Sequence, residues 1–523
     1  MKQVNFLPLR MLTFIFGLIL STGAFAQQIT VNGHVKDGSG EDIIGATVRI
    51  IGQDGGVVTD FDGNFTIQAN QGATLSIAYI GYETVTVAAA PNVEVLLKEE
   101  AAKSLNEIVV IGYGVAKKND LTGSVTAIKP DDKNHGLITN AQDMMQGKIA
   151  GVNVTTDGGA PGTGASIRIR GGSSLNASNA PLIVIDGVAL DNTGVKGMSN
   201  PLSMVNPQDI ESFNVLKDAS ATAIYGSRGS NGVIIITTKK GRANQPVAVS
   251  YAGSVTASVK KKTIDVMNGD EYRKFITDMF GAGSKQVAAL GKANTDWQNE
   301  IYRTALSFDN NVTVTGSVKN VPFRASVGAT NQEGILRTSD FNRYTASLNV
   351  NPSLLDDHLK VNLSAKYMFA KTVYADGGAM GAALGMDPTK PVRTADPRFK
   401  NFGGYFQWLQ EGSVLKDSKW PETKIDLATA NPLSMIDLKN DVAKSNAFVG
   451  NLELDYQVHG LKDLRLHMNI GADVSGGRQD TEVSPASGTN TYYGYSGWEK
   501  INKYNLSYNA YAQYNKTFDE VHH

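Results

Sequence analysis

The chain has 523 residues, a formal net charge of -1 and no cysteine. This length predicts several domains, the near-neutral charge gives no electrostatic case for a nucleic-acid partner, and the lack of cysteine excludes a disulfide scaffold and thiolate chemistry. The mean hydropathy of -0.19, with one long apolar run at the N-terminus, excludes a helical membrane span further along the chain. A membrane barrel stays open, because barrel strands alternate apolar and polar residues.

The N-terminus has the three parts of an export signal. Lys2 and Arg10 precede an apolar core at Met11–Leu20, and Ala24-Phe25-Ala26 then forms an A-x-A cleavage site. The core is too short to cross a bilayer, so we predict a secretory signal peptide at residues 1–26 rather than a membrane anchor.

Residues 28–98 contain short strand patterns, from ITVNGHV to VEVLL, separated by Asp-Gly turns. Short strands at this spacing predict a small immunoglobulin-like β-sandwich. Aspartates in the turns are candidates for calcium ligands or for Asx turns, and the lack of a distal glutamate favours Asx turns: Asp37, Asp54, Asp60 and Asp62.

A polar, alanine-rich linker at residues 101–117 contains a short apolar run, EIVVIGY, at Glu107–Tyr113. We call this run the coupling segment. No partner strand is evident for it, so its unpaired backbone groups are expected to accept a strand from another protein. The alternative is that it forms the first strand of the next domain.

Residues 118–242 predict a compact α+β domain. Two β-branched runs, Leu182–Ile185 and Val233–Thr238, have the pattern of short buried strands, and Ala141–Ile149 has the pattern of a short amphipathic helix. A second helical patch is expected in PQDIESFNVLKDASATAIYG, at 207–226. Gly158–Gly164 is not a phosphate loop, because it lacks the G-K-[ST] ending and no helix follows it.

Charged residues of this domain are candidates for contacts with a surrounding barrel. Arg168 and Arg170 alternate with isoleucines, so both guanidinium groups lie on one face of a strand. We expect them to pair with barrel carboxylates, and the alternative is that they face water. Asp186 in VIDGV and Arg228 in YGSRGSNG are expected to hold turns and contacts with the barrel, and the alternative is contact with the substrate.

From residue 246 to 523 the sequence predicts long antiparallel strands. Apolar and polar residues alternate over about ten positions or more in three stretches, longer than strands of soluble domains: Leu359–Phe369, Phe448–Val458 and Leu464–Val474. Such alternation places one face of a sheet in lipid and the other in a wet lumen. About eight strands are expected: Val247–Val259, Asn311–Val318, Phe323–Thr330, Phe341–Val350, His358–Ala370, Phe448–Val458, Leu464–Val474 and Tyr504–Phe518.

Short and long connections alternate between these strands. Those at Lys319-Asn320, Asn351–Asp357 and Gly460-Leu461 are short, whereas the others are longer and the longest is Lys371–Ala447. Outer-membrane barrels have short periplasmic turns and long external loops. A barrel of eight strands cannot enclose a domain, and an open edge is not viable in lipid, so we expect the barrel to be incomplete in this sequence.

The sequence contains no G-x-S-x-G, H-E-x-x-H or P-loop motif. We therefore expect no enzymatic activity, no cofactor and no bound metal ion.

Several stretches occur in the order found in the SusC/RagA family of TonB-dependent outer-membrane transporters. EIVVIGYG resembles the family's TonB box, and SIRIRGGSSLNASNAPLIVIDGV and IYGSRGSNGVIIITTKKG resemble its plug domain. Residues 28–98 resemble its carboxypeptidase-regulatory-like domain. The resemblance implies a mainly β protein of the outer membrane, with a transmembrane antiparallel barrel of about 22 strands of which this sequence is an N-terminal portion.

The resemblance also assigns roles to residues. The TonB box comprises Glu107, Ile108, Val109, Val110, Ile111, Gly112 and Tyr113, and plug–barrel contacts are expected at Arg168, Arg170, Asp186 and Arg228. Aromatic side chains of the external loops are candidates for stacking on sugar rings, or alternatively for loop packing, an aromatic belt or lid contacts: Tyr405, Phe406, Trp408, Tyr492, Tyr493, Tyr495 and Trp498.

The implied function is active import of a nutrient, an oligosaccharide or in some members a peptide. TonB, energised through the TonB–ExbB–ExbD system, would pull on the coupling segment, and a SusD-like surface lipoprotein would act as a lid. Two such units would associate as a dimer. The alternative is a receptor or adhesin in outer-membrane lipid that binds glycans or host ligands without energy.

Overall fold

The structure is a computed structural model that describes residues 28–37, 42–51, 55–79, 82, 84–97, 108–111, 114–117, 125–128, 140–156, 158–171, 178–198, 200–218, 222–319, 321–410, 424–425, 427–489 and 493–516. The chain divides into two compact units between Glu107 and Ile108, and each unit is described by itself. The predicted signal peptide, residues 1–26, lies outside the described residues.

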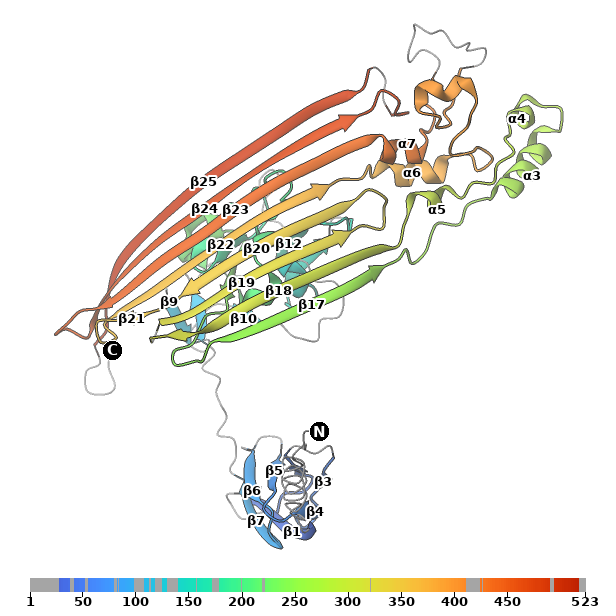
Figure 1. Ribbon diagram of the computed structural model, residues 1–523. Coiled ribbons are helices and arrows are strands. Elements are labelled where there is room, and N and C mark those ends of the chain that lie inside the picture. The colour runs from blue at the N-terminus through green and yellow to red at the C-terminus, as the bar shows by residue number, and fades with distance from the viewer. Residues whose placement is uncertain are drawn as a thin grey trace, which may run out of the picture. The chain divides into compact units, whose positions relative to one another are not determined.

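Seven short strands form the first unit (Figure 1): β1 (Gln28–Asp37), β2 (Thr47–Ile50), β3 (Val57–Val58), β4 (Asn64–Asn70), β5 (Thr74–Ala78), β6 (Val85–Ala88) and β7 (Asn92–Leu97). They pair into two sheets, in the orders β4-β1-β7 and β3-β2-β5-β6. Alternate side chains are buried between the sheets, among them Val35, Phe65 and Leu75. The predicted β-sandwich is confirmed. In one of its turns, Asp60 Oδ1 accepts backbone hydrogen bonds from Asp62 and Asn64, at 3.0 and 2.8 Å, which is an Asx turn.

The plug region of the second unit is built on a mixed sheet in the order β10-β15-β16-β13-β14. Its strands are β10 (Val125–Ile128), β13 (Leu182–Ile185), β14 (Val188–Ala189), β15 (Ile210–Leu216) and β16 (Val233–Thr238). The parallel neighbours β13 and β16 are almost wholly buried, as their β-branched runs predicted. Two separate hairpins pair β8 (Ile108–Ile111) with β9 (Gly114–Lys117), and β11 (Val152–Thr156) with β12 (Ala165–Ile169).

Four short 3₁₀ segments are present in the described part of the plug: η2 (Ala141–Met144), η3 (Pro201–Met204), η4 (Pro207–Asp209) and η5 (Ala223–Gly229). The expected helical patch at 207–226 is wrong over its central part, which is β15. In β15 the buried residues Ile210, Phe213 and Leu216 are spaced three positions apart. A strand that is buried on both faces can therefore show the spacing expected of one face of a helix. Met144, Met145 and Ile149 are buried, although the predicted helix ends after one turn.

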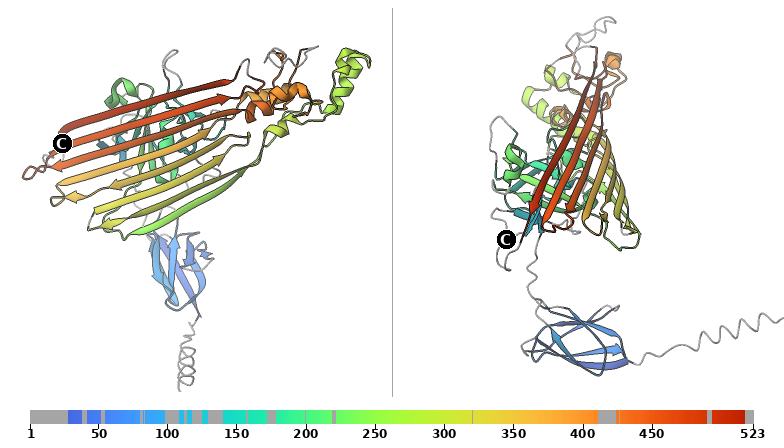
Figure 2. Two further views of the ribbon diagram at one scale, coloured as in Figure 1. Left: turned by 45° about the horizontal axis from the view of Figure 1, so that its top comes forward. Right: turned by 90° about the vertical axis from the view of Figure 1, so that its left-hand side faces the viewer.

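Eight long antiparallel strands, with the short β21 (Ser353–Leu354) beside them, form one curved sheet against which the plug packs (Figure 2). We call it the barrel sheet. Its strands are β17 (Ala248–Ser258), β18 (Ala305–Val318), β19 (Val321–Glu333), β20 (Asp340–Val350), β22 (Leu359–Val373), β23 (Lys439–Gln457), β24 (Leu464–Val483) and β25 (Tyr495–Tyr514). All eight predicted strands are present, and most are longer than predicted.

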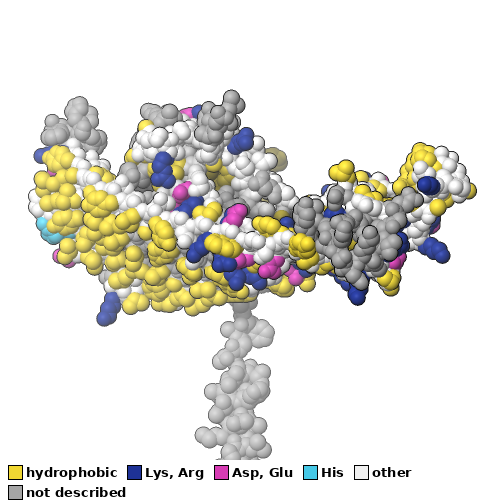
Figure 3. Space-filling view, turned by 90° about the horizontal axis from the view of Figure 1, so that it is seen from above, with side chains coloured by type: hydrophobic (Ala, Val, Ile, Leu, Met, Phe, Trp, Pro, Cys, Tyr) yellow, Lys and Arg dark blue, Asp and Glu magenta, His cyan; other side chains and the backbone are white. Residues whose placement is uncertain are grey.

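The two faces of the barrel sheet differ in polarity. One row of directly paired residues is apolar across all eight strands: Tyr251, Val312, Val327, Ala346, Tyr367, Phe448, Val474 and Tyr504. The next row points to the other face and is mostly polar: Ser250, Thr313, Ser326, Ser347, Lys366, Val449, Asp473 and Asn505. Figure 3 shows hydrophobic side chains gathered along one side of the molecule. The plug lies against the polar face, where its carboxylates meet Lys366 and Arg324. One face therefore suits lipid and the other a polar interior.

Long connections lie at one end of the barrel sheet, which we call the long-loop end. They carry α3 (Gly269–Phe280), α4 (Lys285–Ala288), α5 (Trp297–Ile301), α6 (Gly378–Gly385), η6 (Pro397–Phe402) and α7 (Pro432–Asp437). No helix in the described part of the chain is long and apolar enough to cross a membrane.

Candidate functional site

Asp186 and Gly187 form the two-residue turn between β13 and β14. Their φ values of 45° and 88° are both left-handed, as in the type I′ turn that Asp-Gly favours in a tight hairpin. The backbone N–H and the hydroxyl of Thr238, on β16, donate to the Asp186 carboxylate at 2.8 and 2.6 Å. The turn is therefore fixed to the plug's own sheet.

The same carboxylate forms a buried ion pair with Lys366 of β22, and both side chains are only 3% exposed. The Ser364 hydroxyl donates to it at 3.1 Å, and the Asn451 side chain of β23 donates to the Asp186 carbonyl at 2.7 Å. Burial alone would raise the pKa of Asp186, but the charge of Lys366 and the hydrogen bonds from Lys366 and Thr238 hold that pKa below its usual value. Asp186 is therefore ionised at neutral pH and ties the plug to the barrel sheet.

Asp209, at the end of η4, makes a second contact of the same kind. Its carboxylate accepts a hydrogen bond from Arg324 of β19 at 2.7 Å, and others from the hydroxyls of Ser326 and Ser347. The Arg324 and Asp209 side chains are 11% and 6% exposed.

The two carboxylates meet neighbouring parts of the barrel sheet. Ser326 is paired with Ser347, and Ser347 with Lys366, while Asn349 lies between Arg324 and Ser364 in the adjacent row. Asp186 and Asp209 therefore contact one continuous band of inward-facing polar residues, which we call the docking band: Arg324, Ser326, Ser347, Ser364, Lys366 and Asn451.

Further contacts lie on either side of the docking band. The Asp191 carboxylate is 3.6 Å from Lys503 Nζ of β25, and the Asp191 N–H donates to Asp473 of β24 at 3.1 Å. Burial would raise the pKa of Asp191, but hydrogen bonds from Thr193 and the charge of Lys503 lower it. Arg343 of β20, which is 1% exposed, donates to the Ser203 carbonyl at 3.2 Å.

The plug and the barrel sheet supply the opposite charges from those predicted for Arg168 and Arg170. In the three acid–base contacts just described, the plug supplies the carboxylate and the barrel sheet the base, whereas the ion pair of Lys196 with Glu499 has the opposite sense. The prediction missed the docking band. Its sequence signal was Lys366 on the polar side of Leu359–Phe369, because a cation that faces a barrel interior needs a partner.

The arginines expected at the interface lie elsewhere. Arg170 pairs with Asp218 inside the plug, and Arg168 is exposed on β12. Among the described residues neither arginine pairs with a barrel carboxylate, because β12 pairs with β11 in a separate hairpin whose arginine face is exposed. Arg228 donates to the Leu190 carbonyl at 2.7 Å, which is also a contact within the plug.

Part of the coupling segment is visible as β8, whereas Glu107, Gly112 and Tyr113 lie outside the described residues. β8 pairs with β9, so that Ile108 lies opposite Lys117 and Ile111 opposite Gly114. The expectation of a strand without a partner is therefore wrong, because the chain turns back on itself within a few residues. Within the described ranges β8 pairs with β9 alone, so its second edge stays open to another strand.

Two of the candidate aromatic residues, Tyr405 and Trp498, do not line either of the two clefts described below. Tyr405 is 1% exposed, its hydroxyl donates to Asp437 at 2.8 Å, and the Arg393 guanidinium lies 4.2 Å from its ring centre. It belongs to the packed core of the long loops. Trp498 is exposed on β25, with the Arg478 guanidinium 5.2 Å from its ring centre.

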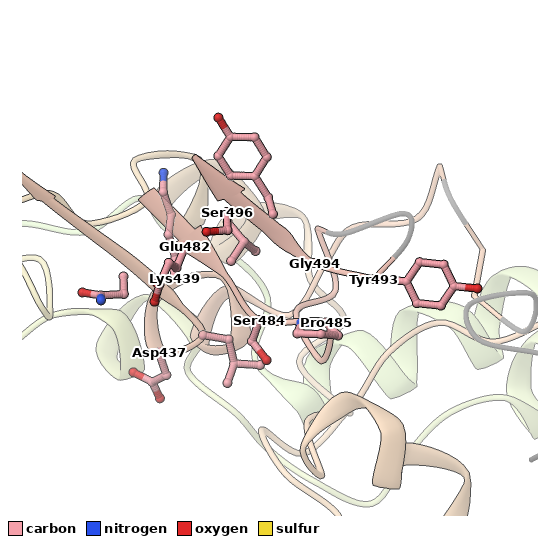
Figure 4. Close-up of a pocket in the computed structure, with 12 residues that line it drawn as sticks. Asp437, Lys439, Glu482, Ser484, Pro485, Tyr493, Gly494 and Ser496 are labelled. Atoms are coloured by element: carbon pink, nitrogen blue, oxygen red, sulfur yellow. The ribbon is translucent and has the colours of Figure 1, made fainter. Parts of the chain in front are cut away.

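Tyr493 and Trp408 each line a cleft at the long-loop end. Tyr493 and Tyr495 border an opening of about 540 Å³ beside β23, β24 and β25, but Figure 4 shows the Tyr493 ring turned away from Asp437, Lys439 and Glu482. Trp408 is half-buried, packs edge-on against Phe406, and lines a larger cleft of about 830 Å³. Tyr492 lies outside the described residues.

Comparison with known proteins places these features in a family. Residues 117–233 match the TonB-dependent Receptor Plug Domain, and residues 31–110 match the CarboxypepD_reg-like domain. TonB-dependent receptor SusC of Bacteroides thetaiotaomicron is 54% identical over 518 residues, which cover 99% of this chain and 51% of that protein. TonB-dependent receptor P26 of Formosa agariphila is 32% identical over 481 residues, 89% of this chain and 45% of that protein.

The fold agrees with that of a solved structure. The RagAB peptide importer in the 'open-open' state superposes with a TM-score of 0.59 at 24% identity, over 79% of this chain and 47% of that one. The chain spans about half the length of the curated relatives that it matches. Over that span, the chain is similar to TonB-dependent receptors of the SusC type and carries their plug and CarboxypepD_reg-like domains.

Proposed function

We propose that the protein imports a nutrient across the outer membrane, with energy delivered by TonB to the coupling segment. The observation that carries the proposal is the chain order: an open-edged strand, β8, directly precedes a plug that is held against the polar face of a barrel sheet. A partner that pairs with β8 would exert its force on the plug, because β8 and the plug lie on one chain. The family relatives are named as TonB-dependent receptors, which supports this reading.

The docking band gives the plug a defined seat that can be released without covalent chemistry. Two ion pairs, each with hydroxyl groups that donate to the carboxylate, compensate the buried charges while the plug is seated. After displacement, the same polar groups would line a wet passage and bind water. Transport then requires mechanical work, which TonB–ExbB–ExbD supplies from the inner membrane.

The remaining assignments are part of the proposal. Residues 1–26 export the chain, residues 28–98 form a domain before the linker at 101–117, residues 118–242 are the plug, and residues 246–523 are barrel. The nutrient is an oligosaccharide, with a peptide as the second candidate because RagAB is described as a peptide importer. A SusD-like lipoprotein covers the long-loop end, and two such units form a dimer.

The test is deletion of residues 107–113 in the intact receptor in its native host. Outer-membrane levels are checked first, and growth and labelled uptake are then scored on a panel of glycans and peptides. Deletion of residues 99–105 shortens the linker by the same length and is the matched control. We expect the first deletion alone to abolish uptake of one nutrient class. Normal uptake of every nutrient that requires the gene would favour a receptor or adhesin that works without energy.

A further inference from the structure

Four cations form a row across neighbouring strands on the apolar, outward face of the barrel sheet. They are paired directly from each strand to the next, on β22, β23, β24 and β25: Lys371, Lys444, Arg478 and Lys500. We call them the basic row. All four residues are exposed. Neighbouring strands lie about 4.8 Å apart, so the row is about 14 Å long.

The basic row lies at the border of the apolar surface. Each member lies four residues along its strand from the apolar row through Tyr367, on the side of the long-loop end. On β22 the outward side chains from Phe369 to Leu359 are apolar, which corresponds to about 33 Å of strand. A strand tilt of about 40° reduces this length to about 25 Å, the height of the lipid-facing band of an outer-membrane barrel. Because long loops are external, the basic row is placed where lipid tails give way to the head groups of the outer leaflet.

The charges of the basic row are only partly compensated. Like charges directly opposite each other on a sheet destabilise it. Arg478 donates to Asp480 at 2.6 Å, whereas the three lysines of the row make no hydrogen bond or ion pair within the described ranges. Two carboxylates of the next row, Asp340 and Asp480, are close enough to act on the lysines, but the cations outnumber them by two. An anion bound across the row would remove the remaining repulsion.

We propose that the basic row binds the phosphate groups of a glycolipid in the outer leaflet of the outer membrane. Lysine and arginine form charge-assisted hydrogen bonds with phosphate oxygens. A lipid suits this place better than a free anion, because its acyl chains would lie along the apolar side chains below the row, among them the exposed Tyr367, Tyr504 and Leu506. The proposal requires the barrel sheet to lie in the outer membrane, and it depends neither on TonB nor on a nutrient.

The test titrates lipids into the delipidated intact receptor in detergent and measures binding by native mass spectrometry. The probes are diphosphoryl lipid A, the same lipid after removal of both phosphates, and inorganic phosphate. We expect diphosphoryl lipid A to bind, and the dephosphorylated lipid to bind at least about tenfold more weakly. Millimolar inorganic phosphate should not displace the phosphorylated lipid, because it lacks the contacts of the acyl chains.

Paired substitutions locate the site. Lys371→Ala combined with Lys444→Ala should weaken diphosphoryl lipid A about tenfold or more and leave the dephosphorylated lipid unchanged. Lys371→Arg combined with Lys444→Arg keeps both charges and should retain most of the affinity. The matched control is Lys319→Ala combined with Lys462→Ala, which removes two exposed lysines from turns at the opposite end of the barrel sheet and should bind as the parent does.

Thermal stability gives an independent readout. Without lipid, the double alanine variant of the basic row should unfold at or above the temperature of the parent, because fewer like charges lie side by side. Diphosphoryl lipid A should raise the Tm of the parent more than that of the variant. Asp480→Asn frees Arg478 and should tighten binding of this lipid about threefold. A lower Tm of the lipid-free double variant would contradict the repulsion on which the proposal rests.

Three binding results would overturn the proposal. They are equal affinity of the parent and the double alanine variant for diphosphoryl lipid A, equal affinity for the phosphorylated and dephosphorylated lipids, and displacement of the lipid by inorganic phosphate. If the double variant keeps its lipid affinity but loses a protein that copurifies with the parent, the row is a protein-docking surface and the proposal also fails. Since neither TonB nor a nutrient is present, failure of the import mechanism would leave these results unchanged.

Discussion

Replacement of Lys366 with methionine keeps the side-chain length and removes the charge that faces Asp186. Both side chains are 3% exposed, so the Asp186 carboxylate would be left buried without a cation. Removing one partner of a buried ion pair costs about 3–5 kcal/mol. Thr238 and Ser364 still donate to Asp186, which favours the lower end of that range. At about 1.4 kcal/mol per factor of ten, the seated plug would lose roughly two orders of magnitude in its equilibrium with displaced states.

A buried cysteine reports this equilibrium. Val188 is 2% exposed and lies against Gly471 of β24, so a cysteine at this position reacts with a membrane-impermeant maleimide only when the plug leaves the barrel sheet. The 523 residues contain no cysteine, and the receptor with Val188 intact serves as the blank for any thiol elsewhere. With Val188→Cys as the background, Lys366→Met should raise the labelling rate about a hundredfold.

Two further variants make this prediction refutable. Lys371→Met, an exposed lysine of the same strand, should label like the parent. Adding Asp186→Asn to Lys366→Met removes the unpaired charge and should return the rate most of the way to the parent. The reasoning is refuted if Lys366→Met labels at the parental rate, or if the double variant labels faster than the single one.

Three other perturbations follow from the same interface. The pKa of Asp186 is lowered in the seated plug, so ionised Asp186 stabilises the seated plug fully above the usual carboxylate pKa of about 4, and this stabilisation is lost as pH falls through the lowered value. Pepsin cleavage of the plug in outer-membrane vesicles should therefore rise only below about pH 4. A rise near about pH 6 would contradict this assignment. Phe213→Ala empties a fully buried site on β15 and should cost about 3–5 kcal/mol, seen as faster trypsin cleavage of the plug, whereas Ile224→Ala at an exposed site should have little effect. Gly162 of the plug has a φ of 69°, and a Cβ added there would lie 2.4 Å from the ring of Phe341 in the barrel sheet. Gly162→Ala should therefore loosen the plug and increase passive antibiotic entry, and Phe341→Ala should partly reverse the increase. No change in entry would argue against this contact.

The barrel sheet was predictable because its pattern is local. Each strand alternates apolar and polar residues. This alternation shows which residues share a face even when the partner strand is not known. The rows through Tyr367 and Lys366 repeat this difference across the whole sheet. The strand bounds were less predictable, because β23 and β24 extend into segments whose alternation is interrupted by small and charged residues.

The plug–barrel contacts were predictable only in part, because they depend on distant pairings. Asp186 and Lys366 are 180 positions apart, and nothing local relates them. Asp186 was an expected contact because its Asp-Gly turn stood out, whereas Asp209 follows a Pro-Gln pair without a comparable signal. Arg168 and Arg170 have the stronger local pattern, yet the β11–β12 hairpin leaves them exposed.

The central claim is that backbone pairing at β8 couples the plug to TonB, and one substitution pair at Val110 tests it most directly. Val110→Pro removes a backbone N–H and disfavours the extended pairing, whereas Val110→Thr keeps the backbone and the β-branched shape. Uptake of a labelled nutrient is measured in cells that display equal amounts of each receptor. The account predicts that the proline variant loses uptake and the threonine variant keeps it. Uptake by the proline variant at the parental rate would contradict the claim.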